Sequence, residues 1–121
     1  MKKNKTSFTL WYDPDGNPTT YIEAEKYLSN RKTKIVKQQT TRSGRLVSTV
    51  YLGLNYSFIQ EKILIYETMV FQSGQNLSEL DVQRYETRKE AKAGHKAMFK
   101  KWNEIRFATL NSIEQAIDKI I

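Results

Sequence analysis

The chain has 121 residues, 39% hydrophobic and 12% aromatic, a length and composition that suit one globular domain able to bury about two-thirds of its unfolded surface. It has no cysteine, which excludes a disulfide framework and a thiolate metal site and fits a reducing cytoplasm. No apolar run approaches the roughly 20 residues of a membrane span, and the first residues, MKKNKTSF, lack the apolar core of a signal peptide. We therefore expect a single cytoplasmic domain over residues 1–121, without membrane association.

The net charge of +7 comes mainly from two segments. Residues 31–45 hold six basic side chains and no acidic one, and residues 88–101 hold six with Glu90 as the one acid. Such patches are typical of proteins that bind phosphate, either in a nucleic-acid backbone or in a small phosphorylated ligand. Solvated charge on an ordinary surface explains them equally well, so charge by itself leaves both interpretations open.

The N-terminal part predicts one strand and one short helix. The β-forming FTLWY at 8–12 is stopped by DPDGNP, whose residue types favour a turn. Thr20 and Glu23 then form a capping box that opens a helix through about Leu28. The polar stretch SNRKTK is expected to end this helix.

Four further strands are predicted, roughly at 34–41, 45–54, 63–71 and 81–86. The first two are joined at RSG, where Gly44 permits a hairpin with positive φ. Short connections between successive strands indicate an antiparallel meander. The strand ILIYETMVF at 63–71 is apolar on both of its alternating faces, a pattern expected in a sheet that is covered on both sides.

The period changes to that of a helix after Thr87, which forms a second capping box with Glu90. An apolar helix face is expected to pack on the sheet, and a last helix is predicted at about 104–121. On the opposite face of the first helix, basic residues recur at every fourth position. These residues, here called the basic ridge, are Arg88, Lys92, Lys96 and Lys100. The simplest interpretation is a solvated helix face, and the alternative is a surface that contacts a row of phosphate groups.

These elements predict an α+β domain with an antiparallel sheet of about five strands and a short helix over 8–86, backed on one face by C-terminal helices over 87–121. Little chain remains to cover the other apolar face of the sheet. We therefore expect a second copy of the protein to cover it, in a homo-oligomer built from dimers.

Residues typical of catalysis are scarce. The sole histidine, His95, has no second His or Cys to complete a metal set or a nucleophilic pair, so we interpret it as a packed, hydrogen-bonded side chain. Glu67 is either a general acid with a raised pKa or the ion-pair partner of Arg84 or Arg45, and the pair is the better supported of the two. We expect a protein that is not an enzyme and that needs no metal or cofactor.

Four segments taken together resemble the Thoeris anti-defence 1 family of phage proteins. They are YDPDGNP, STVYLGLNYSF, ILIYETMVF and RYETRKEAKAGHKAMFKKW, which occur in this order over residues 12–102. The resemblance implies a phage sponge that binds a cyclic ADP-ribose signal in the cytoplasm of the infected bacterium, and so blocks TIR-dependent immunity. It also implies pockets where two subunits meet. The chain lacks a Gly-rich turn before Ile63 that the family has, so the isomer bound is not specified.

Such a ligand carries an adenine and a pyrophosphate, which favour aromatic stacking surfaces and arginines. We expect Phe71, Tyr85, Arg84 and Arg88 to converge on one rim, where the N-terminus of the long helix also favours an anion. Glu67 is expected to orient an arginine at the seam between subunits, and Met69 completes the predicted set.

Two other functions remain open from the sequence. The basic ridge, with Tyr and Trp residues nearby, also suits a nucleic-acid-binding phage regulator or an inhibitor of a host nuclease complex. A hydrolase of a cyclic nucleotide has no nucleophile or metal set in its favour. Because no aromatic residue is spaced along the ridge to stack bases, nucleic acid is the less favoured partner.

Overall fold

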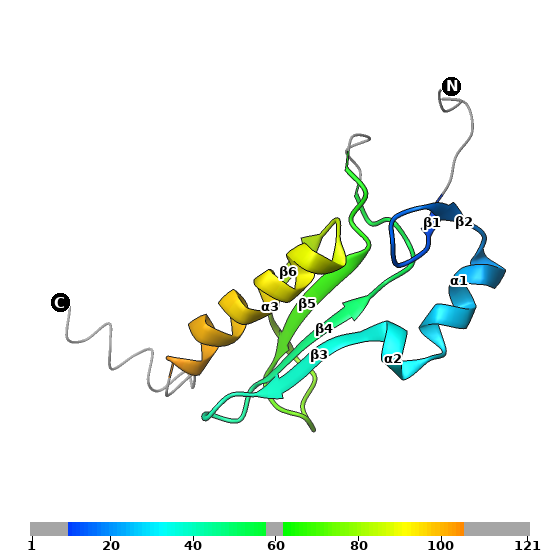
Figure 1. Ribbon diagram of the computed structural model, residues 1–121. Coiled ribbons are helices and arrows are strands. Elements are labelled where there is room, and N and C mark those ends of the chain that lie inside the picture. The colour runs from blue at the N-terminus through cyan, green and yellow to red at the C-terminus, as the bar shows by residue number, and fades with distance from the viewer. Residues whose placement is uncertain (1–9, 58–61, 106–121) are drawn as a thin grey trace.

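The computed structural model describes residues 10–57 and 62–105 and has an α+β architecture (Figure 1). It contains a two-stranded antiparallel ribbon, β1–β2, and a four-stranded antiparallel sheet in the order β3-β4-β5-β6. The elements are β1 Trp11–Tyr12, β2 Pro18–Thr19, α1 Tyr21–Leu28, α2 Arg31–Lys34, β3 Ile35–Thr40, β4 Leu46–Tyr51, β5 Tyr66–Phe71, β6 Glu79–Tyr85 and α3 Arg88–Asn103.

The helix starts follow the capping residues in the sequence. The side chain of Thr20 accepts a hydrogen bond from the backbone N–H of Glu23 at 3.2 Å, and that of Thr87 accepts from Glu90 at 3.1 Å. Asn30 does the same for α2, a short helix within the stretch SNRKTK that was predicted only to end the first helix. Each cap satisfies a backbone donor that the first helical turn leaves unpaired.

The predicted meander is confirmed, with one difference at its start. Gly44 takes φ +91° in the hairpin between β3 and β4, as its position in RSG predicts. The first predicted strand, however, pairs with Pro18–Thr19 and meets the segment after β4 at a single bridge between Trp11 and Leu54, so it is not a strand of the main sheet. The reason lies in the turn, because Asp13 Oδ1 accepts from the N–H groups of Asp15 and Asn17 and folds the chain directly back on itself.

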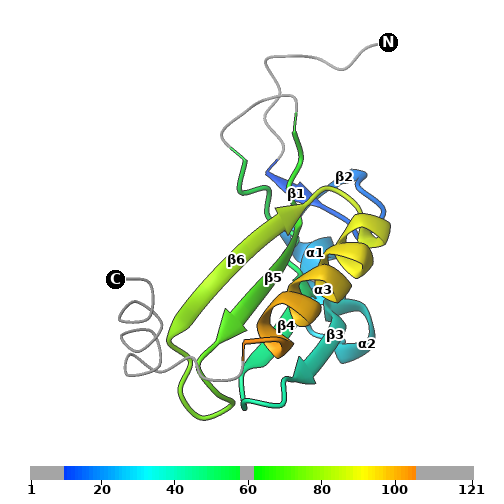
Figure 2. The ribbon, with the colours of Figure 1, turned by 90° about the vertical axis from the view of Figure 1, so that its left-hand side faces the viewer.

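One side of the four-stranded sheet is covered mainly by α3, and α1 meets the same side through Tyr27. Helix α3 runs across this face and contacts all four strands (Figure 2). Tyr27 of α1 meets Tyr51 of β4 edge-on, at 6.2 Å between ring centroids. One buried cluster is centred on Tyr51, Ile65 and Tyr66, and a second on Val47, Val70 and Met98. The last predicted helix lies almost wholly outside the described residues, where α3 ends at Asn103 with Glu104 as its C-cap.

Candidate functional site

The sheet face opposite α3 carries four of the six predicted site residues. Strand register aligns Val50 with Glu67 and Arg84, and Ser48 with Met69 and Val82, in successive rows across β4, β5 and β6. Paired residues in neighbouring strands point to the same side of a sheet. This surface, here called the open sheet face, therefore combines apolar side chains with one ion pair; its residues are Leu46, Ser48, Val50, Glu67, Met69, Phe71, Val82 and Arg84.

Glu67 and Arg84 form the ion pair at one end of the open sheet face. Arg84 Nε donates to Glu67 Oε2 at 2.9 Å, with 38% of the arginine side chain exposed and 10% of the glutamate. The guanidinium also lies 5.1 Å from the ring centroid of Tyr56. The predicted Glu67–Arg84 pair is thus confirmed. Arg45, the other predicted partner, instead lies over the ring of Trp102 at 5.5 Å.

Phe71 stands at the other end of the same face. It is partly exposed at the end of β5 and aligns with Leu46 of β4. Since Glu67 pairs with Arg84 and lies four residues before Phe71, the strand rise of ~3.3 Å per residue separates the Cα atoms of Phe71 and Arg84 by about 13 Å along the strand direction. Met69, also partly exposed, occupies the position between them. The two predicted anchor residues therefore share a face but do not touch.

Tyr85 and Arg88 lie on the α3 side and not with Arg84. The hydroxyl of Tyr85 donates to Thr68 Oγ1 at 3.1 Å, and the residue is 9% exposed. Arg88 reaches the carbonyl of Thr33 at 3.5 Å. Arg84 and Tyr85 are successive residues of one strand, so their side chains must point to opposite faces. The structure thus does not bring the four residues expected at one rim together.

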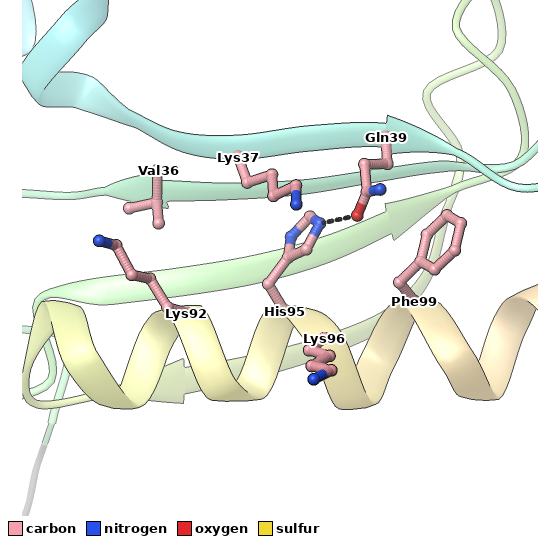
Figure 3. A pocket seen from close by; sticks show the side chains of 7 residues that line it. All are labelled: Val36, Lys37, Gln39, Lys92, His95, Lys96 and Phe99. Atoms are coloured by element: carbon pink, nitrogen blue, oxygen red, sulfur yellow. Dashed lines mark hydrogen bonds between the residues drawn. The ribbon is translucent and has the colours of Figure 1, made fainter.

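A cleft between β3 and α3 is a feature that the sequence analysis did not identify. Its volume is about 500 Å³, and Figure 3 shows side chains from both elements around it. It is lined by Val36, Lys37, Gln39, Lys92, His95, Lys96 and Phe99. The spacing of the basic ridge identified Lys92 and Lys96, but no sequence signal indicated that Lys37 of β3 would line the same cleft. This group is called the β3–α3 cleft below.

His95 forms the floor of this cleft and is confirmed as a packed, hydrogen-bonded histidine. It is 1% exposed, with Nδ1 2.6 Å from Thr49 Oγ1 and Nε2 2.8 Å from Gln39 Oε1. With the amide oxygen of Gln39 as acceptor, Nε2 carries the proton and Nδ1 accepts from Thr49. Burial first, and then the charge of Lys37, lower the pKa of His95 below its ordinary value.

The neutral ring of His95 completes a directed chain of hydrogen bonds through the core. Tyr85 donates to Thr68, Thr68 is bonded to Thr49, and Thr49 donates to the ring. In this direction, the hydroxyls of Tyr85, Thr68 and Thr49 each donate one hydrogen bond, and the two threonines each accept one. All three buried hydroxyl groups therefore have a partner. Because both ring nitrogens are engaged in this chain, its evident role is structural.

Within residues 10–57 and 62–105, no cluster of three or more His, Asp or Glu side chains is arranged to hold a metal ion. In the same ranges, no helix has the length and apolar character needed to cross a membrane. The open sheet face and the β3–α3 cleft both have features of a binding site, and a smaller hollow of about 380 Å³ lies between β6 and α3. Comparisons with protein-family models, with curated proteins and with solved structures gave no match for this chain.

Proposed function

We propose that the protein is a non-catalytic sponge that binds a cyclic ADP-ribose isomer on its open sheet face and withholds it from a TIR-dependent (Thoeris) antiviral effector. The observation that carries this proposal is Arg84, a partly exposed guanidinium held by Glu67 and stacked on Tyr56. A guanidinium fixed in this way loses little side-chain entropy when it meets a phosphate, and it offers a flat surface to a base. The family-like segments of the sequence supply the identity of the ligand.

The separation of Phe71 and Arg84 supports a site shared between two copies. A ligand that contacts both residues of one subunit must span about 13 Å along the strand. When two sheets pack about a two-fold axis, a contact of residue i with residue j of the partner occurs twice. Phe71 of one copy can then approach Arg84 of the other. Covering the apolar side chains of the open sheet face would favour the same arrangement. The proposed assembly is therefore a homo-oligomer built from dimers.

Binding is favoured over turnover by the state of the titratable residues. His95 is engaged at both ring nitrogens inside the core, and Glu67 is held by Arg84. The Thr49 hydroxyl lies 2.6 Å from the His95 ring, as a nucleophile beside a general base would, but the two residues are 0% and 1% exposed and out of reach of a substrate. The proposed protein therefore holds its ligand unchanged.

The direct test is recovery of the ligand. Purified protein is incubated with a cyclic ADP-ribose isomer, separated from excess ligand, denatured, and the supernatant is analysed by mass spectrometry. Recovery of the intact isomer from the wild type, and its loss from Arg84→Ala, is the expected result. A converted product would identify an enzyme instead, and no retained isomer would contradict the sponge.

The outward lysines of α3 favour a second candidate function, as a nucleic-acid-binding regulator or an inhibitor of a host nuclease complex. Lys89, Lys92, Lys96 and Lys100 are all exposed on this helix. Exposed lysines attract any polyanion through counterion release, with little dependence on sequence. Retention of nucleic acid or of a nuclease complex at physiological salt, without retention of the cyclic isomer, would support this alternative.

A further inference from the structure

The β3–α3 cleft gathers positive charge that no described carboxylate balances. Lys37 comes from β3, and Lys92 and Lys96 come from α3, one helical turn apart. No Asp or Glu lines the cleft. The ion pairs found in residues 10–57 and 62–105 involve other lysines and arginines, namely Lys26, Arg84 and Lys101. Like charges held around a concave surface raise its potential, and an anion inside it lowers their mutual repulsion.

The geometry directs one of these charges over the floor of the cleft and a second to its Val36 end, whereas Lys96 points away from β3 (Figure 3). In Figure 3, Lys37 extends from β3 toward the ring of His95, and Lys92 extends from α3 toward Val36. The charge of Lys37 acts on the ring of His95 at that floor and contributes to lowering its pKa. His95 and Gln39 are bonded to each other and make the floor polar. An anion seated above them would lie beside the ammonium group of Lys37.

The ends of the cleft are apolar, which limits the kind of anion that fits. Val36 lies at one end, and the partly exposed ring of Phe99 lies at the other (Figure 3). A volume of about 500 Å³ is larger than inorganic phosphate needs and falls in the range of roughly 300–1,000 Å³ typical of small-ligand sites. An aromatic ring is a surface on which a flat base or similar group stacks.

We infer that the β3–α3 cleft is a binding site for a phosphate monoester joined to a flat aromatic group, a ligand of the size and chemistry of a nucleoside monophosphate. Lys37 and Lys92 bind the phosphate, Lys96 adds charge, and Phe99 contacts the aromatic group. The site lies on the α3 side of the sheet and within one subunit. It is therefore separate from the open sheet face and does not depend on the function proposed for that face.

The sole histidine gives this inference a specific probe. His95 contributes the one imidazole signal of the chain, so its ring resonances report on the floor of the cleft without assignment of other residues. The full-length protein is titrated with AMP, with adenosine and with inorganic phosphate, and the ring signals are followed by NMR. A phosphate above the ring opposes the effect of Lys37, so saturating AMP is expected to raise the pKa of His95.

Saturable shifts with AMP, at a dissociation constant below about 1 mM, are expected for the wild type. Inorganic phosphate should bind at least about tenfold more weakly, and adenosine should give no saturable shift over the same concentrations. The absence of saturable AMP shifts would overturn the site. Equal affinity for AMP and inorganic phosphate would overturn the part assigned to Phe99.

Matched variants separate this site from general electrostatic attraction. Lys37→Gln and Lys92→Gln each remove one exposed charge from the cleft, and each should weaken AMP by about tenfold. Lys100→Gln removes the same charge from the same helix outside the cleft and should leave the AMP affinity unchanged. Arg84→Ala should also leave it unchanged, whatever its effect on a cyclic ligand. An equal loss of AMP affinity in Lys100→Gln would show that net charge alone explains the binding, and it would refute the site.

Discussion

Tyr85 occupies the space that a side chain at position 94 would fill. A Cβ atom built on Gly94 would lie 2.1 Å from the ring of Tyr85, which is closer than any real contact. The helix thus approaches β6 closely because Gly94 has no side chain, and the ring of Tyr85 fits into the gap. This contact also places the Tyr85 hydroxyl at the start of the hydrogen-bond chain that ends at His95.

Gly94→Ala is expected to destabilise the protein, although alanine has the higher helix propensity. The propensity gain is about 1 kcal/mol, whereas overpacking a buried ring costs typically ~1–3 kcal/mol and also disturbs the Tyr85–Thr68 hydrogen bond. We expect a net loss of free energy of unfolding in urea titrations. Gly74→Ala is the control, because a Cβ at Gly74 meets nothing within 4 Å. A Gly94→Ala variant as stable as this control would contradict the packing.

Acid should weaken the fold through His95. Its pKa is lowered in the folded state, so the unfolded chain takes up a proton first as the pH falls below about 6.5. The contribution of His95 to the free energy of unfolding should therefore be present in full above that pH and should decrease below it. Protonation of Nδ1 also removes the acceptor for Thr49. Urea titrations between about pH 5.5 and 7 should show this slope in the wild type and lose it in His95→Asn. Equal slopes would refute the assignment.

Phe71→Ala tests whether the ring at the end of β5 belongs to a binding site or to the core. A plain core role predicts a loss of about 3–5 kcal/mol of stability. If the ring is instead a stacking platform, its removal should weaken the binding free energy of a cyclic ADP-ribose isomer by on the order of 1–3 kcal/mol and leave the fold and assembly intact. Calorimetry with the isomers, run beside thermal melts, separates the two. A melt that collapses, or an affinity that does not change, would place the site elsewhere.

Arg84→Ala should weaken the same ligand through lost phosphate or stacking contacts, while Glu67 loses its partner. Glu67 is 8% exposed, so its unpaired carboxylate should also lower the free energy of unfolding. The double variant Glu67→Gln with Arg84→Ala removes that unpaired charge. It should recover stability but not binding, as measured by calorimetry and thermal melts. Recovered binding would show that Arg84 does not contact the ligand.

Self-association should depend on the open sheet face. Covering several hundred Å² of apolar surface per subunit at ~25 cal/mol/Å² is enough for a stable dimer. Light scattering at micromolar concentration should therefore give a mass of a dimer or larger assembly. Met69→Lys places a charge on this face and should shift the protein to monomer, whereas Ala93→Lys, exposed on α3, should not. A clean monomer in the wild type would contradict the assembly.

Nucleic-acid binding, measured by fluorescence anisotropy, should be weak and independent of base sequence. The lysines of α3 offer attraction to phosphate, which fades steeply with salt. No described residue of the exposed helix face is an aromatic side chain placed to stack bases in series. Tight, sequence-dependent binding at physiological salt would favour the regulator over the sponge.

The sequence by itself determined the elements that local chemistry controls. Thr20 and Thr87 each supply a capping oxygen within one turn of their helix, and Gly44 supplies a positive φ within one hairpin. An arginine partner for Glu67 on a neighbouring strand, Arg84 or Arg45, was predictable because successive strands of a meander are neighbours, and the register of the structure selects Arg84. These signals involve residues close in sequence or strands adjacent in order, so no knowledge of the packing is needed to use them.

Only the tertiary structure decided which side chains share a surface. Strand alternation separates Arg84 from Tyr85, and the strand pairing of Phe71 sets its distance from Arg84, whereas the predicted elements led us to expect these three residues and Arg88 at one rim. The packing of α3 across the sheet brings Lys92 and His95 opposite Val36 and Lys37, and so creates the β3–α3 cleft. That orientation depends on side-chain packing such as Tyr85 against Gly94, a contact between distant positions that no local pattern encodes.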